Sequence, residues 1–289
     1  MTPAADKCRL GRSDLEHHRK TRIAPDHPRC WSEEMRFDFP GKKLESIAST
    51  AARSSSTPYS STSRERAREI LALLKGVVLQ GRTILDIGCG PAPLSDNFRY
   101  MSSRIVGLDR EHRYVKQARK NFLLELVLGD ATNLPFKDES FNFVLCNDVL
   151  EHIADSERLA NELSRVLAQG SATYVQCASK YQIIEPHFLL PFLSWLPQPF
   201  ADLYVRLSRR GESYAGYHPK TRKELLHLFR GYRTIDLTYE RTLMKIKTLS
   251  IKSKSLLCTV SCLRKILPDQ VIAALTEKFS ILAILVFKD

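Results

Sequence analysis

The stretch ILDIGCGPA at residues 84–92 decides the fold. Apolar residues typical of a buried strand lead to Asp86, and a glycine-rich turn follows before a helical pattern begins. Gly88 and Gly90 lack the Cβ that would prevent the backbone from approaching a ligand closely, and the next helix begins with unpaired N–H groups. The stretch therefore predicts a strand, a ligand-binding turn and a helix in succession.

Apolar strand-like runs and helical patterns alternate around this stretch. A helix with Ser63 as its N-cap precedes it, and Gly76 and Gly81 end that helical pattern. The alternation is typical of an α/β protein with a Rossmann-like, doubly wound sheet, seven-stranded and mostly parallel, with helices on both faces. We expect strands over 83–87, 105–108, 126–128, 141–146 and 172–177, and helices over 94–101, 111–120 and 156–168.

The pattern changes after Cys177. The aromatic, proline-broken segment from Tyr181 to Tyr204 predicts a lid over a substrate rather than a strand or helix of the core. A helix over 220–229, a strand over 234–239 and a last strand over 281–287 resume the alternation. The basic stretch Met244–Leu267 has its leucines on one helical face, which fits either a membrane surface or packing on the sheet.

These patterns divide the chain into two parts. Residues 1–62 are basic and rich in serine and proline, which predicts a flexible segment. Residues 63–289 form the folded domain. Its ligand-binding half covers 64–177, and its lid and C-terminal part cover 178–289.

Composition restricts the partners and the compartment. The formal net charge of +12 favours an anionic partner, such as nucleic acid or an acidic membrane surface. The seven cysteines are widely spread, which is typical of reduced, cytoplasmic proteins. Cys8 and Cys30 enclose histidines, but no CxxC pair supports zinc, so the sequence predicts no metal site. We see no signal peptide, and the apolar run 281–287 is too short to span a membrane.

Polar residues end four successive predicted strands. Asp86 and Asp109 end the first two, Asp130 with Ala131 follows the third, and Asn147 ends the fourth. Ligands of doubly wound sheets bind at the carboxyl ends of the strands, and a carboxylate about twenty residues past the turn can accept both hydroxyls of a ribose. Together they predict one nucleoside-shaped site. A nicotinamide site is disfavoured because its GxGxxG turn needs glycine at position 93, which is Pro93 here.

Five motifs carry a resemblance to a known family: LDIGCG, VGLD, GDATNLPFKDESFNFV, LEHI and ELSRVLAQG, all between residues 85 and 170. With them the chain resembles the class I S-adenosylmethionine-dependent methyltransferases, in particular the small-molecule branch of the ubiquinone and menaquinone biosynthesis enzymes. The resemblance implies S-adenosyl-L-methionine as cofactor. It also implies a role for each strand-end residue: Asp86, Gly88 and Gly90 around the methionine part, Asp109 on the ribose, Asp130 and Ala131 at the adenine, and Asn147 beside the transferring methyl.

The sequence departs from the family pattern at two places. Ala92 stands where the third glycine of a GxGxG turn is usual, and Ala168-Gln169-Gly170-Ser171 replaces the usual KPGG corner. An alanine methyl is a small intrusion, so we expect weakened cofactor binding at most. A non-catalytic, methyltransferase-like binding or scaffold protein is an alternative with the same core.

The fourth strand end informs the choice of acceptor. Asn147 is followed by Asp148-Val149-Leu150, not by the two prolines and aromatic residue of amino-methylating enzymes. This favours O- or C-methylation of a small apolar acceptor, such as a lipid-like, quinone, polyketide or isoprenoid molecule, met in the cytoplasm or at a membrane surface. An RNA or protein methyltransferase using the basic N-terminal segment is the alternative enzyme. The residues considered as catalytic groups, none of them assigned, are His152, His187, His218 and Tyr214.

Overall fold

The computed structural model describes residues 59–74, 76–252, 267–268, 271 and 279–289. Residues 1–58 of the predicted flexible segment, Cys8 and Cys30 among them, and residues 253–266 of the basic stretch Met244–Leu267 lie outside the described residues. The last four residues of the predicted flexible segment, 59–62, are helical instead.

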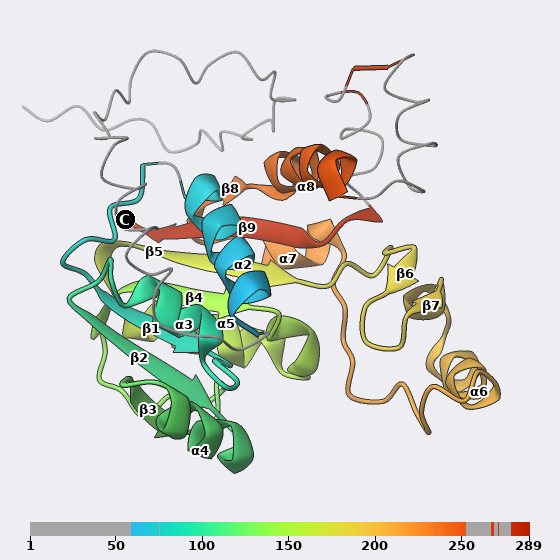
Figure 1. Cartoon of the computed structure of the whole chain (residues 1–289), viewed down its shortest axis with the longest axis horizontal. Coiled ribbons are helices and arrows are strands. Elements are labelled where there is room, and N and C mark those ends of the chain that lie inside the picture. The colour runs from blue at the N-terminus through green and yellow to red at the C-terminus, as the bar shows by residue number, and fades with distance from the viewer. Residues whose placement is uncertain (1–58, 75, 253–266, 269–270, 272–278) are drawn as a thin grey trace, which may run out of the picture. The chain divides into compact units, whose positions relative to one another are not determined.

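The core is a seven-stranded sheet in the order β3-β2-β1-β4-β5-β9-β8. Strands β1 to β5 pair in parallel, and β9 runs antiparallel between β5 and β8 (Figure 1). The predicted seven-stranded, mostly parallel sheet is therefore confirmed. The strands are β1 (Thr83–Ile87), β2 (Arg104–Asp109), β3 (Glu125–Leu128), β4 (Phe141–Asn147), β5 (Leu167–Cys177), β8 (Arg233–Asp236) and β9 (Leu282–Lys288).

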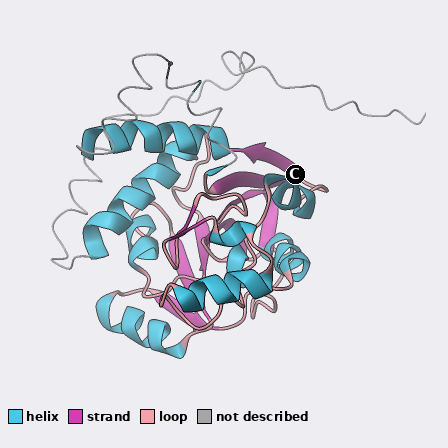
Figure 2. Ribbon diagram, turned by 90° about the vertical axis from the view of Figure 1, so that its right-hand side faces the viewer, coloured by secondary structure: helices cyan, strands magenta, loops and turns pink. Residues whose placement is uncertain are grey.

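Helices cover both faces of this sheet, as the side view shows (Figure 2). One face packs against α5 and α7 and the other against α2, α3 and α8, while α4 packs at the β2–β3 edge. Burial of apolar side chains on both faces explains why the strands read as continuous apolar runs. The helices are α2 (Tyr59–Leu73), α3 (Pro93–Phe98), α4 (His112–Asn121), α5 (Ser156–Val166), α7 (Arg222–Leu228) and α8 (Thr238–Lys252).

Some predicted boundaries were wrong. Ser63 is not an N-cap, because α2 begins at Tyr59 and Ser63 continues the buried stripe of Ala67 and Ile70. Helix α5 ends at Val166 and β5 begins at once. Strand β8 ends at Asp236, whose Oδ1 accepts a hydrogen bond from the Thr238 N–H at 2.9 Å and starts α8.

Residues 181–217, called the lid below, lie outside the seven-stranded sheet, as the sequence predicts for residues 181–204. The lid has structure of its own. Two short strands, β6 (Ile184–Glu185) and β7 (Leu190–Pro191), pair with each other. Helix α6 (Gln198–Leu207) packs Ala201 and Val205 against Leu193 and Tyr214 in a small separate core. The lid therefore holds its shape with its own apolar contacts.

Candidate functional site

The glycine-rich turn has the backbone shape that only glycine adopts without strain. Gly88 and Gly90 have φ of +64° and +56°. A Cβ at Gly88 would overlap the side chain of Val149, whereas one at Gly90 would meet no atom within 4 Å. Gly88 is thus needed for packing, and Gly90 borders open space where a ligand can approach the backbone.

Asp109 fixes this turn. Its Oδ2 accepts a hydrogen bond from the Gly90 N–H at 2.8 Å, and its Oδ1 accepts one from the Glu111 N–H, also at 2.8 Å. The carboxylate ends β2 and is largely buried. Each oxygen has a second lone pair, so the carboxylate can accept further hydrogen bonds from a ligand.

Asp86 ends its strand in a buried position beside the turn. Its Oδ2 accepts a hydrogen bond from the Ser95 hydroxyl of α3. Burial raises the pKa of this carboxyl to about 7, against the lowering effect of Ser95 and with a smaller contribution from nearby Asp109. A cationic group of a ligand placed here would favour the ionised form.

Asp130 and Ala131 lie together after β3. The Asp130 Oδ1 accepts hydrogen bonds from both the N–H and the hydroxyl of Thr132 at 2.8 Å, and these bonds lower the pKa of the carboxyl. Ala131 is buried in the main core. Asp130 is exposed and ionised, and it lies at the carboxyl ends of the parallel strands, as Asp86 and Asp109 do.

Asn147 ends β4 with an unsatisfied atom. Its Oδ1 is buried without a hydrogen-bond partner, while its Nδ2 donates to Asp148 at 3.1 Å. Asp148 also pairs with Arg66 of α2 at 3.0 Å and accepts a bond from Gln176 at 2.8 Å. Gln176 in turn accepts from Arg241 of α8 at 2.9 Å. A buried carbonyl oxygen without a partner is costly, so Asn147 is available to a donor on a ligand.

Ala92 adopts the left-handed conformation usual for glycine, with φ of +61°. Its methyl group is fully buried and packs in a cluster with Cys89, Val115 and Ala118. The methyl group therefore points into protein, away from the open side of the turn at Gly90.

The lid brings a histidine pair to the site. His187 Nδ1 lies 2.7 Å from Oε1 of buried Glu185, and Glu185 Oε2 accepts the backbone N–H groups of His187 and Phe188. The His187 ring lies 5.0 Å from the His152 ring and 4.4 Å from the Tyr217 ring, centroid to centroid. The hydrogen bond to Glu185 raises the pKa of His187, whereas burial and His187 lower the pKa of His152.

Glu151 is a buried carboxyl beside this pair, with 2% of its surface exposed. Its Oε1 accepts a hydrogen bond from the Ala178 N–H at 3.3 Å, and its Oε2 is buried without a partner. Burial, with Asp148 adding to it, raises its pKa to about 7. His218 reaches this place through its backbone only, since its N–H donates to the Glu151 carbonyl at 2.6 Å.

The structure therefore separates the four residues considered from sequence as catalytic groups. His152 and His187 come together, while Tyr214 is buried in the lid core and stacks on Tyr217. Sequence reasoning missed Glu151, Glu185 and Tyr217. The Glu-x-His spacing of Glu185 and His187 was a usable signal, because two residues that are two positions apart in an extended chain have their side chains on the same side.

Within the part of the chain that the structure describes, no cluster of His, Cys, Asp and Glu side chains could hold a metal ion. Over the same residues, none of the helices combines the length and the apolar character needed to cross a bilayer.

A doubly wound sheet with a glycine-rich turn after β1 and acidic residues at the carboxyl ends of β1 and β2 is typical of nucleotide-binding α/β proteins. Residues 85–175 match the model of the methyltransferase domain family. A demethylmenaquinone methyltransferase from Desulfitobacterium hafniense is 30% identical over 155 residues, which cover 48% of this chain and 61% of the relative.

A sterol 24-C-methyltransferase from Aspergillus fumigatus is 30% identical over 101 residues, covering 32% of this chain and 27% of the relative. This chain thus spans less than two thirds of the length of either relative. A solved structure of a methyltransferase from Thermotoga maritima is 16% identical, covers 86% of this chain and 96% of that chain, and gives a TM-score of 0.47. Residues 85–175 therefore carry a methyltransferase domain, and over this part the chain is similar to S-adenosylmethionine-dependent methyltransferases.

Proposed function

We propose that this protein transfers a methyl group from S-adenosylmethionine to an oxygen or carbon atom of a small, apolar acceptor. The observation that carries the proposal is the meeting of two half-sites. The strand-end residues Asp86, Asp109 and Asn147 lie along one edge of the sheet, and the lid places His187 beside His152 of the loop after β4.

The residues at the strand ends fit the cofactor. The open space at Gly90 admits a ligand to the turn, and the unpaired Oδ1 of Asn147 can accept from its amino group. Asp86 would face the positively charged methionine part, Asp109 the ribose hydroxyls, and Asp130 with Ala131 the adenine. When bound, the cofactor supplies an electrophilic methyl group on a sulfonium. Asn147 would hold the methionine part next to the acceptor.

We assign the role of general base to His187. Glu185 holds its Nδ1 at 2.7 Å and so leaves Nε2 to accept a proton from the acceptor. The carboxylate stabilises the imidazolium that forms. A base is needed for a hydroxyl or an acidic carbon, because either must lose a proton when the methyl group arrives. Orientation of the acceptor and exclusion of water by the lid contribute the rest.

The apolar character of the acceptor follows from the side chains around His187. The ring of Tyr217 lies against both histidines, and Phe188 packs on Tyr217 at 5.6 Å. The aromatic faces of Tyr217 and Phe188 suit a flat, apolar molecule, and the histidines beside Tyr217 supply the polar contacts. The two curated relatives named above are a menaquinone-pathway and a sterol enzyme by name, which supports the same class of acceptor.

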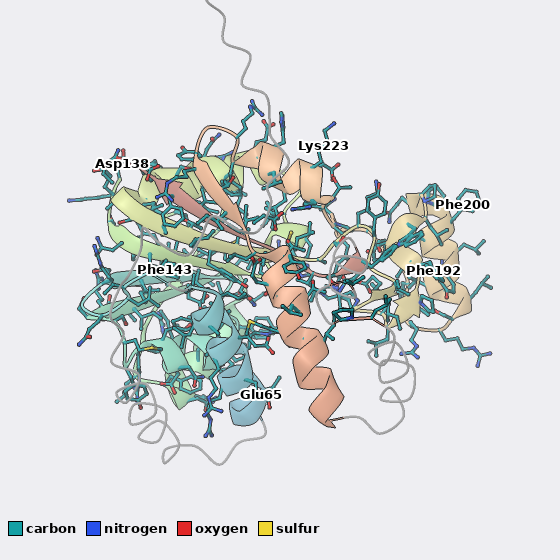
Figure 3. The ribbon with its side chains drawn as sticks, turned by 90° about the horizontal axis from the view of Figure 1, so that it is seen from above. Glu65, Asp138, Phe143, Phe192, Phe200 and Lys223 are labelled. Atoms are coloured by element: carbon teal, nitrogen blue, oxygen red, sulfur yellow. The ribbon has the colours of Figure 1, made fainter. Side chains whose placement is uncertain are left out.

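Calorimetric titration of S-adenosylmethionine and S-adenosylhomocysteine into the purified chain tests the first half of the proposal. We expect micromolar binding, weakened about ten- to a hundredfold by Asp109→Asn, because a charge-assisted hydrogen bond to the ribose is lost and either the Gly90 or the Glu111 N–H loses its acceptor. Asp138→Asn is the control, since exposed Asp138 precedes the amino end of β4, whereas Asp109 lies at the carboxyl end of β2 (Figure 3). Absence of binding to well-folded protein would overturn the proposal.

The second half is tested with lipophilic phenols and quinols as acceptors and radiolabelled cofactor. We expect His187→Gln to lower the rate constant for methyl transfer while cofactor binding is unchanged. Turnover of a structured RNA or a protein, with none of the lipophilic acceptors, would contradict the acceptor class.

A further inference from the structure

The lid exposes apolar side chains at a density found nowhere else in the described residues. Of the sixteen large hydrophobic residues that are exposed there, ten lie between residues 181 and 207. Single exposed apolar side chains are ordinary on a protein surface, but a contiguous group marks an interaction site. The ten are Tyr181, Ile183, Ile184, Leu189, Phe192, Trp195, Leu196, Phe200, Leu203 and Leu207.

Helix α6 arranges part of this group as a stripe. Phe200, Leu203 and Leu207 are spaced three and four residues apart, so they share one side of the helix. Their exposed fractions are 62%, 50% and 73%. Ala201 and Val205 lie on another side of α6, where they are fully buried and pack in the lid core. Much of the outer stripe is therefore left open to solvent, while Ala201 and Val205 hold α6 in place.

Aromatic rings extend this surface beyond α6. Trp195 has its ring centroid 5.1 Å from that of Phe192 and 6.2 Å from that of Tyr181. Figure 3 shows Phe192 and Phe200 on the side of the molecule that carries α6, away from Phe143 in the central sheet. Trp and Tyr side chains, apolar with one polar atom, are favoured at the boundary between lipid and water.

The charges around the stripe identify its partner. Arg206, Arg209 and Arg210 are exposed on α6 and the turn after it, and Glu212 is the exposed acidic residue of the lid. Asp202 accepts hydrogen bonds from Ser213 and Tyr214 within the lid, and Glu185 is buried. An apolar stripe bordered by arginines fits a bilayer with anionic headgroups. A second copy docked on the same stripe would add three more arginines to the contact and no exposed acidic side chain except Glu212, which disfavours this occupant.

We propose that α6 and the neighbouring aromatic residues of the lid dock on the surface of an anionic lipid bilayer. Phe200, Leu203 and Leu207 enter the headgroup boundary, and the three arginines contact the headgroups. The biological purpose of this docking rests on the proposed function: an apolar acceptor resides in lipid, and His187 and Tyr217 of the same lid border the proposed acceptor site. The docking itself is a property of α6.

Sedimentation of the full chain with vesicles tests this inference. One set of vesicles is phosphatidylcholine, and the other contains about one third phosphatidylserine. We expect binding to the anionic vesicles that falls at least about thirtyfold in the variant Phe200→Ser/Leu203→Ser/Leu207→Ser. The control is Val78→Ser/Leu123→Ser, which removes two exposed apolar side chains outside the lid and should bind as the native chain does.

The charge contribution is tested with Arg206→Gln/Arg209→Gln/Arg210→Gln. This variant should lose affinity for the anionic vesicles and keep its weaker affinity for phosphatidylcholine. Equal binding by the native chain and the serine variant would overturn the inference. So would a dimer in light scattering that the serine substitutions dissociate, since the stripe would then be a contact between copies. Cofactor calorimetry on each variant separates these outcomes from a failure of the proposed function.

Discussion

Replacing Gly88 by alanine should destabilise the protein through two separable effects. The first is backbone strain, because the φ of +64° costs a residue with a Cβ about 1 kcal/mol. The second is overlap of the new methyl group with Cγ2 of Val149. Val149 is buried and β-branched, so it cannot rotate freely to make room. Overpacking of this kind costs about 1–3 kcal/mol, which gives a total of about 2–4 kcal/mol.

A second substitution separates the two effects. Val149→Ala removes both Cγ atoms and so removes the overlap, while the strain at residue 88 remains. In the Val149→Ala background, Gly88→Ala should therefore cost only about 1 kcal/mol. Urea unfolding of the native chain, the two single variants and the double variant gives the coupling free energy directly. An equal cost of Gly88→Ala in both backgrounds would refute the steric reasoning and leave backbone strain as the whole effect.

Three further predictions concern charge and conformation. Because Glu185 raises the pKa of His187, the rate of methyl transfer should increase as the pH rises through that pKa, and Glu185→Gln should move the inflection to lower pH. NMR titration of the His187 ring measures this pKa in both proteins. An equal pKa in the native chain and in Glu185→Gln would contradict the role given to the Glu185–His187 hydrogen bond. The folded-state pKa of Asp86 is raised to about 7, so the stability that this group contributes is full below its ordinary value of 3.8 and is lost as the pH rises through about 7. The urea midpoint should therefore fall between about pH 4 and pH 7, and it should fall less in Asp86→Asn. Ala92→Gly should change the free energy of unfolding by less than about 1 kcal/mol, because relief of strain and loss of a buried methyl nearly cancel, and calorimetry should show no gain in cofactor affinity.

The sheet and its strand ends were predictable from sequence for a physical reason. Strands buried on both faces read as continuous apolar runs, and residues such as Asp86 and Asp109 follow those runs directly. Local patterns of this kind do not depend on distant parts of the chain. The apolar run over 281–287 likewise predicted β9 as a strand. Its antiparallel place between β5 and β8 could not be predicted from those apolar residues.

The rest of the site depends on contacts between distant residues. Arg66 pairs with Asp148, and Arg241 reaches Gln176, across separations that no local period records. The burial that raises the pKa of Glu151 comes from the surrounding fold, not from its neighbours in sequence. The helix within the lid was missed because prolines at 197 and 199 suggested an irregular segment, whereas prolines are favourable in the first turn of a helix.

The place of β9 between β5 and β8 has a consequence for the order in which the chain acquires its structure. Residues 282–288 provide the hydrogen bonds for one side of β5 and for all of β8. Until they emerge from the ribosome, the growing chain carries an open sheet edge along β5 and an unpaired β8. The cofactor half can reach its own strand order earlier, but a product that stops before Leu282 retains an edge prone to pairing with other chains. Messages truncated before the codons of β9 should therefore yield aggregated protein.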